Sequence, residues 1–153
     1  MANSTTTQVA GILSVPPTPQ KVGDIGGRVR TLQGNFALPA LPVNDTICIG
    51  KLPKGARLLP QSCIVISTAQ GATTLSVGSA PSQASGQLVG TITATKYGSA
   101  RTYTTAAAPL FLDQVTDLGV EIANAYGEDI YITIGTATAT PGTLKSFLQY
   151  VVD

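Results

Sequence analysis

The residues whose types and spacing could do chemistry are three carboxylates. Asp113, Asp117 and Glu121 are spaced four apart, so on a helix they would share one face. Such a face would suit Mg²⁺ or Ca²⁺, which prefer oxygen ligands. On strands and loops the same side chains scatter, because strand side chains alternate with a period of two. Gly119 weakens the helix, so we interpret the three as solvated loop carboxylates and expect no metal site.

Nucleophilic catalysis finds little support in the rest of the sequence. There is no histidine, so Ser-His-Asp and Cys-His arrangements and His-ligated metals are impossible. Cys48 and Cys63 each lie in an apolar, strand-like run and lack a base partner. We expect buried free thiols, with a disulfide between neighbouring strands as the alternative. We therefore predict that the chain is not an enzyme, with no catalytic residue and no cofactor.

The length and net charge of the chain limit the kinds of partner that it can bind. The chain has 153 residues, one domain's worth, and a net charge of +1 from nine basic and eight acidic residues. The basic residues are scattered, so we expect no nucleic-acid partner. No run of residues is long enough to span a membrane, and the first 20 residues do not resemble a signal peptide. We expect a protein made and kept in the cytosol, unless it leaves as part of something larger.

The elements that must position these residues are expected to be strands. "DIYITIGTA" places Ile130, Ile132 and Ile134 on one face. "GTLKSFLQYVV" places on one face Leu144, Leu148, Tyr150 and Val152, with Ser146 as the small member. "CIVIS" is apolar throughout, which is typical of a strand covered on both sides. We expect about seven or eight strands, hence an all-β sandwich or barrel. No amphipathic helix longer than two turns is visible, and Gly119 and the β-branched residues weaken the best candidate, residues 109–126.

The first part of the chain differs from the rest. Residues 1–42 are dense in Pro, Gly and Thr, and the run around Pro16 and Pro17 favours an extended backbone. We interpret residues 1–42 as an extended N-terminal arm with one or two short strands, such as residues 28–32. The β domain is expected over residues 43–153. An arm of this kind cannot fold alone, so it lies on its own domain or on a neighbour.

The order of these elements resembles the small capsid decoration, or cement, proteins of tailed bacteriophages. The resemblance rests on "LPKGARLLPQSCIVIST" as the first long strand and "TTLSVGSA" as a strand ending in Val-Gly. It also rests on "FLDQV" after the central loop and on the closing hairpin "DIYITIGTATATPGTLKSFLQYVVD". The resemblance spans roughly residues 43–153, and nothing in the arm matches residue by residue.

This resemblance implies a single jelly-roll-like β sandwich and a structural role in the virion. Proteins of this family decorate the outer capsid surface, stabilise the icosahedral shell and bridge neighbouring major capsid proteins. The implied partners are the major capsid protein and further copies of the chain, a homotrimer more than a homodimer. The implied location is the outer capsid surface, after a stay in the host cytoplasm before assembly.

Two groups of residues are candidates for contact with partners. The apolar and proline residues of the arm could bury against a neighbour, and the basic residues could meet an acidic surface. For Lys51, Lys54 and Arg57 the alternative interpretation is a solvated turn between strands. The candidates are Val9, Ile12, Leu13, Val15, Pro16, Pro17, Arg28, Arg30, Lys51, Lys54 and Arg57.

An alternative function is a phage tail, fibre or spike β domain that binds host-surface glycans. Such a domain needs an exposed cleft of polar and aromatic side chains. Tyr97, Tyr103 and Tyr126 are the aromatic residues that could line one, and packing on strands or at a rim is the other interpretation of them.

Overall fold

The computed structural model describes residues 28–84 and 91–152. Within these ranges all the regular secondary structure is β-strand. No described residue belongs to a helix long and apolar enough to cross a membrane. The strands are, in chain order, β1 (Arg30–Leu38), β2 (Thr46–Leu52), β3 (Ala56–Leu58), β4 (Cys63–Ile66), β5 (Thr74–Pro81), β6 (Thr93–Thr102), β7 (Pro109–Phe111), β8 (Glu128–Gly135) and β9 (Gly142–Val152).

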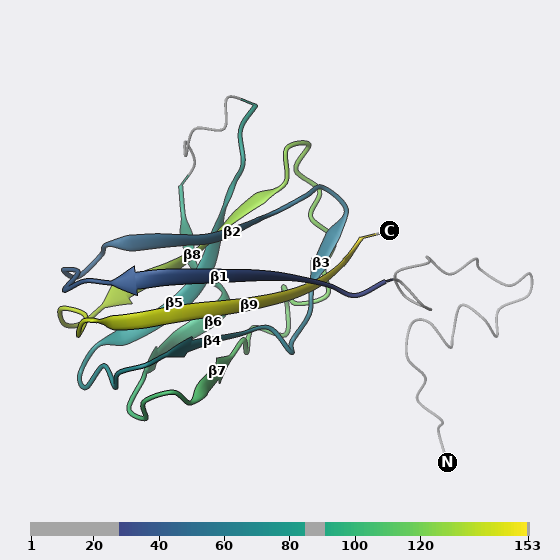
Figure 1. The fold of residues 1–153 in the computed structure, drawn as a ribbon. Coiled ribbons are helices and arrows are strands. Elements are labelled where there is room, and N and C mark those ends of the chain that lie inside the picture. The colour runs from purple at the N-terminus through teal and green to yellow at the C-terminus, as the bar shows by residue number, and fades with distance from the viewer. Residues whose placement is uncertain (1–27, 85–90, 153) are drawn as a thin grey trace, which may run out of the picture.

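The strands form two antiparallel sheets that pack face to face (Figure 1). One sheet has the order β1-β9-β4-β7, with β3 also paired to β9, and the other has the order β2-β8-β5-β6. When β3 is left out, the eight remaining strands follow the order of a jelly roll, with 1-8-3-6 in one sheet and 2-7-4-5 in the other. The prediction of an all-β, jelly-roll-like sandwich is therefore confirmed.

Alternating apolar residues explain why these segments become strands that enclose one core. Ile130, Ile132 and Ile134 of β8 are fully buried, as their spacing predicts. Leu144 and Leu148 of β9 face them from the other sheet and belong to the same core cluster. Each sheet thus turns one apolar face inward.

The long strand expected within "LPKGARLLPQSCIVIST" is two strands. Pro60 lies between β3 and β4, and both of these strands pair with β9. Proline cannot donate a ladder hydrogen bond, so the pairing stops there and resumes at Cys63. This split raises the number of strands to nine among the described residues.

The weak helix candidate over residues 109–126 does not form, in keeping with the expectation that the carboxylates in it lie on loops. The segment begins with β7 and continues in turns, with Gly119 in a left-handed conformation at φ +79°. The four-residue spacing of Asp113, Asp117 and Glu121 therefore does not place them on one face of a helix.

Part of the predicted arm lies in the sandwich. Residues 30–38 form β1, which pairs with β9 from Arg30 opposite Tyr150 to Leu38 opposite Gly142. The expected short strand at residues 28–32 is thus longer and starts at Arg30. Residues 1–27 of the arm lie outside the described residues.

Small residues let the two sheets approach where β1 crosses β2. A Cβ atom on Gly34 would lie 2.5 Å from the Ser146 Oγ and 3.3 Å from the Ile49 carbonyl oxygen. The Ser146 hydroxyl itself donates to that carbonyl at 3.5 Å. Gly34 therefore keeps β1 close to the inner face, and its neighbours Gln33 and Asn35 point outward.

Candidate functional site

The outer face of the β1-β9-β4-β7 sheet carries the candidate site. The strand registers place Gln33 beside Phe147, Phe147 beside Cys63, and Cys63 beside Phe111. These side chains share the face opposite to fully buried Ile64, because neighbouring strand residues point to opposite faces. One row of residues therefore runs across all four strands on the outside of the sandwich.

A second row lies beside the first on the same face. It runs from Asn35 through Lys145 and Val65 to Pro109. We call Phe147, Cys63, Phe111, Val65 and Pro109 the apolar patch. Cys63, Val65 and Phe147 are half-buried and Pro109 is exposed. The exposed fraction of Phe111 is 50%, so the described residues leave this patch open to solvent.

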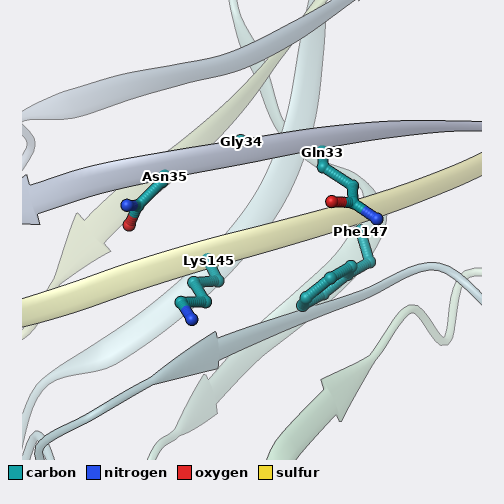
Figure 2. A pocket seen from close by; sticks show the side chains of 5 residues that line it. All are labelled: Gln33, Gly34, Asn35, Lys145 and Phe147. Carbon is teal, nitrogen blue, oxygen red and sulfur yellow. The ribbon is translucent and has the colours of Figure 1, made fainter.

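A shallow hollow of about 470 Å³ lies where β1 and β9 pair (Figure 2). Its walls are Gln33, Gly34, Asn35, Lys145 and Phe147. A second hollow of about 170 Å³ continues the face toward β4, and Lys145 lines this one too. The exposed Lys145 ammonium makes no ion pair with any described residue.

The chemistry of this face suits contact with another surface. Amides and an ammonium can donate hydrogen bonds at its edge, and the aromatic and aliphatic side chains can be buried against a partner. Burial raises the pKa of the Cys63 thiol, so at neutral pH this sulfur is protonated and a poor nucleophile. No acid–base pair stands beside it on the described part of the face.

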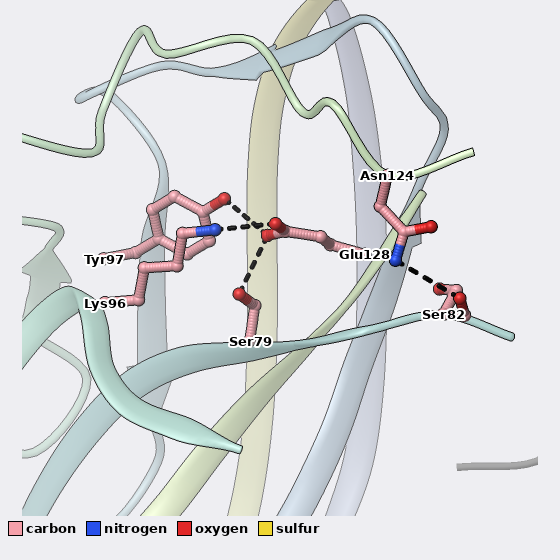
Figure 3. A network of polar contacts seen from close by, with 6 residues as sticks. All are labelled: Ser79, Ser82, Lys96, Tyr97, Asn124 and Glu128. Carbon is pink, nitrogen blue, oxygen red and sulfur yellow. Dashed lines mark hydrogen bonds and ion pairs between the residues drawn. The ribbon is translucent and has the colours of Figure 1, made fainter. Parts of the chain in front are cut away.

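A buried polar network links strands of the β2-β8-β5-β6 sheet at the start of β8 (Figure 3). The Glu128 carboxylate accepts hydrogen bonds from the Lys96 ammonium at 2.6 Å and from the Ser79 and Tyr97 hydroxyls, each at 2.8 Å. Beside it, the Ser82 hydroxyl donates to Asp129 at 2.8 Å. These contacts join β5, β6 and β8.

The hydrogen bonds and charges of this network set the protonation states of Glu128 and Tyr97. Burial raises the pKa of Glu128, but the hydrogen bonds from Lys96, Ser79 and Tyr97 and the Lys96 charge outweigh it and leave that pKa below its usual range. Burial and the Glu128 charge raise the pKa of Tyr97. Near neutral pH, Glu128 stays ionised and Tyr97 stays protonated, so neither is poised to exchange a proton.

The three spaced carboxylates do not converge. Asp113 accepts hydrogen bonds from the backbone N–H and the hydroxyl of Ser99 and lies 3.5 Å from Arg101. Glu121 pairs with Arg57 at 3.4 Å. Within residues 28–84 and 91–152, no group of three His, Cys, Asp or Glu side chains is arranged to hold a metal ion.

The three tyrosines do not line an exposed cleft, and for Tyr97 and Tyr103 the interpretation as packing on strands is confirmed. Tyr97 and Tyr103 are buried at 2% and 3% exposure, and only Tyr126 of the three is exposed. The Tyr103 hydroxyl accepts a hydrogen bond from the Ile66 backbone N–H at 2.9 Å and donates to the Ala108 carbonyl. Tyr97 and Tyr103 therefore pack between strands and do not offer stacking faces to a glycan.

The cysteines only partly follow the expectation. Both are free thiols, so the alternative of a disulfide between them is wrong. Cys63 is half-buried on the outer face, but Cys48 is exposed. Cys48 lies between the buried Ile47 and Ile49 on β2, and the alternation of the strand turns it outward.

The candidate contact residues fall into two places. Val9, Ile12, Leu13, Val15, Pro16 and Pro17 lie outside the described residues. Arg28 and Arg30 are exposed at the start of β1, at the end of the sandwich where β9 finishes. Tyr150 of β9 links this end to β3, because it pairs with Arg30 on one side and Leu58 on the other.

The remaining basic candidates lie at or near this end too. Lys51 near the end of β2 and Lys54 in the following turn are exposed. Arg57 on β3 is different, because it donates to the Gly119 carbonyl at 3.2 Å and pairs with Glu121. Arg57 therefore holds the turn after β7, and the four exposed cations form what we call the basic end: Arg28, Arg30, Lys51 and Lys54.

Sequence reasoning missed the apolar patch. A signal was present, because "CIVIS" has apolar residues at both odd and even positions. The other members, Phe111 and Phe147, come from distant parts of the chain. Only the pairing of β4 with both β7 and β9 brings them to Cys63.

Comparisons with known proteins support the fold. The chain is similar to a chain in a structure of the capsid of Ralstonia phage GP4, with a TM-score of 0.68 and 20% identity over 88% of this chain and 91% of that one. It is also similar to a chain in the cyanophage Pam1 capsid asymmetric unit, with a TM-score of 0.57 and 21% identity over 84% of this chain and 88% of that one. No protein-family model and no curated protein matches the chain. At this identity the likeness shows a shared fold.

Proposed function

We propose that this protein is a structural component of a phage virion, which decorates the outer surface of the capsid and bridges neighbouring major capsid proteins. The observation that carries the proposal is the jelly roll, shared over more than four fifths of the chain with chains from two phage capsid structures. The residues of the outer face support it, because they suit burial against a partner and offer no reacting groups.

Two surfaces would make the contacts. The basic end presents exposed cations from two segments, which suits an acidic patch on the shell. The apolar arm residues from Val9 to Pro17 provide the second contact, laid along a neighbouring subunit. Each contact is modest, but many copies on a fixed lattice raise the effective concentration and hold the coat in place.

Assembly as a homo-oligomer follows from the same mechanism, with a trimer favoured over a dimer. A trimer presents three basic ends at once, so one loosened contact is held near its site by the other two. The protein would collect in the host cytoplasm and join the outer surface of the shell during assembly. No reaction and no cofactor are part of this role.

The experiment adds purified full-length protein to expanded capsids of the same phage that lack it, and measures the bound fraction by sedimentation. Replacing Lys51 and Lys54 with Gln should weaken binding about tenfold at low salt, because two favourable charge contacts are lost. The matched control replaces Thr104 and Thr105, which are exposed before β7, with Glu. It changes the net charge equally and should bind normally. Full-length protein that does not sediment with any capsid would refute the proposal.

A further inference from the structure

The apolar patch on the outer face lacks a cover among the described residues. Cys63 and Val65 stand on a strand whose other face, at Ile64 and Ile66, is completely buried. Phe111 adds a half-exposed aromatic ring next to Cys63. Contiguous apolar surface of this kind on a soluble protein marks a place where something binds. The "CIVIS" pattern points the same way, since it is typical of a strand covered on both faces.

We propose that residues 9–17 of the same molecule cover the apolar patch in the free protein. This segment, "VAGILSVPP", contains Val9, Ile12, Leu13 and Val15, and it follows eight residues without a charged side chain. The described strands bury the core residues Ile64, Ile66, Ile130 and Ile132 completely without any contribution from this segment. An apolar segment and an open apolar face on one chain lower the free energy when they meet.

Charge favours this segment over a second copy of the face. The two rows carry one formal charge, the Lys145 ammonium, which has no ion pair among the described residues. Two copies packed face to face would bury two such ammonium groups with no acid on either face, and this is costly. Residues 1–20 contain no charged side chain, so they can cover the patch while Lys145 stays at its edge in water.

The length of the chain makes the contact possible within one molecule. The chain enters the sheet at Arg30, three residues before Gln33 on the first row, a distance of about 10 Å along the strand. From β1 to β7 the face is three strand spacings wide, about 14 Å. The ten residues 18–27 reach up to about 33 Å when extended, so they can return residues 9–17 to the patch.

This inference does not depend on the capsid role, because it concerns the isolated protein. It gives the arm two successive sites: the patch before assembly and a neighbouring subunit afterwards. Assembly would exchange one apolar contact for another, and the segment would not be left in water meanwhile.

The experiment measures the alkylation of Cys63 and Cys48 by iodoacetamide in the full-length protein, peptide by peptide, by mass spectrometry. Cys63 lies in the centre of the patch, and exposed Cys48 on β2 is the internal reference. Replacing both Leu13 and Val15 with Asp should speed alkylation of Cys63 at least tenfold and leave Cys48 unchanged. The control, with Thr5 and Thr6 replaced by Asp, adds the same charge outside the segment and should keep Cys63 slow.

The possible results separate the candidate covers. Equal Cys63 rates in the native and Leu13/Val15 proteins would overturn the proposal, because residues 9–17 would then not shield the thiol. Protection that disappears on dilution of the native protein would also overturn it and identify a second copy as the cover. Protection that is independent of concentration and lost only in the Leu13/Val15 protein supports it.

Discussion

The Glu128 carboxylate is ionised and almost closed off from water, with 11% of its side chain exposed. It remains charged because the Lys96 ammonium and two hydroxyls solvate it in place of water. The network therefore ties β5, β6 and β8 together through one side chain, and removing a partner leaves a charged group without its hydrogen bonds.

A lower pH should weaken the stabilisation that the Glu128 network gives to the fold. The pKa of Glu128 in the folded protein is below its usual range, and in the unfolded chain it is about 4.3. The ionised carboxylate therefore stabilises the fold fully above the unfolded pKa, and this contribution is lost as the pH falls through the folded pKa. We expect Glu128→Gln to lower the free energy of unfolding by about 1–3 kcal/mol at pH 6, and by less at pH 3.

Urea unfolding of both proteins at the two pH values checks this expectation. Asp45→Asn is the control, because the Asp45 side chain makes no ion pair with a described residue. A difference between native and Glu128→Gln protein that is the same at pH 6 and pH 3 would contradict the role given to the ionised carboxylate.

At the scale of elements, β9 organises one sheet. It pairs with β1 along one edge and with β3 and β4 along the other. Its inward residues Leu144 and Leu148 join the core, and its outward residues Lys145 and Phe147 form the middle of the exposed face. One strand thus supplies both the stability of the sandwich and the centre of the candidate contact surface.

The turn before β8 depends on a glycine. Gly127 has φ +84°, and a Cβ atom there would lie 2.0 Å from the Leu52 carbonyl oxygen of β2. Gly127→Ala should therefore cost about 2–5 kcal/mol of stability, from backbone strain and from displacement of β2.

Thermal or urea unfolding measures this cost, and Gly119→Ala is a matched control. Gly119 has a similar φ of +79°, but a Cβ atom there would meet nothing within 4 Å. Its substitution should cost about 1–2 kcal/mol, from strain alone. Equal losses for the two variants would show that the contact with Leu52 is unimportant.

At the scale of the whole molecule, the candidate contact surfaces are the outer face of one sheet and one end of the sandwich. The β1-β9-β4-β7 sheet carries the apolar patch, and the basic end lies where β1 begins and β9 finishes. The proposed contacts with the shell come from the basic end and from residues 9–17, so we expect little movement of the described strands on binding.

Binding of this protein should also stabilise the capsid shell. A ligand that binds only the intact shell stabilises that shell by mass action. The gain is about 2.7 kcal/mol per site when the free ligand concentration is a hundred times Kd. Capsids saturated with the protein should therefore open at a temperature several degrees higher than bare capsids, as measured by release of packaged DNA. An unchanged opening temperature at full occupancy would count against a stabilising coat.

The sequence alone predicts the class of fold and the inward face of several strands. The alternation at Ile130, Ile132 and Ile134 places them in the core, because side chains two apart on a strand share a face. Leu144 and Leu148 are predicted in the same way. These are local patterns, and a half-buried strand needs only its neighbours in sequence to show them.

The tertiary structure alone decided which segments pair and which face stays open. Residues 30–38 look like part of a proline-rich arm, and only their pairing with β9 makes them a strand of the sandwich. The apolar patch combines Cys63, Phe111 and Phe147, which no local pattern connects. Pairing between distant strands depends on the formation of the whole sheet. The surface patches that this pairing creates therefore cannot be recognised from any single segment of the sequence.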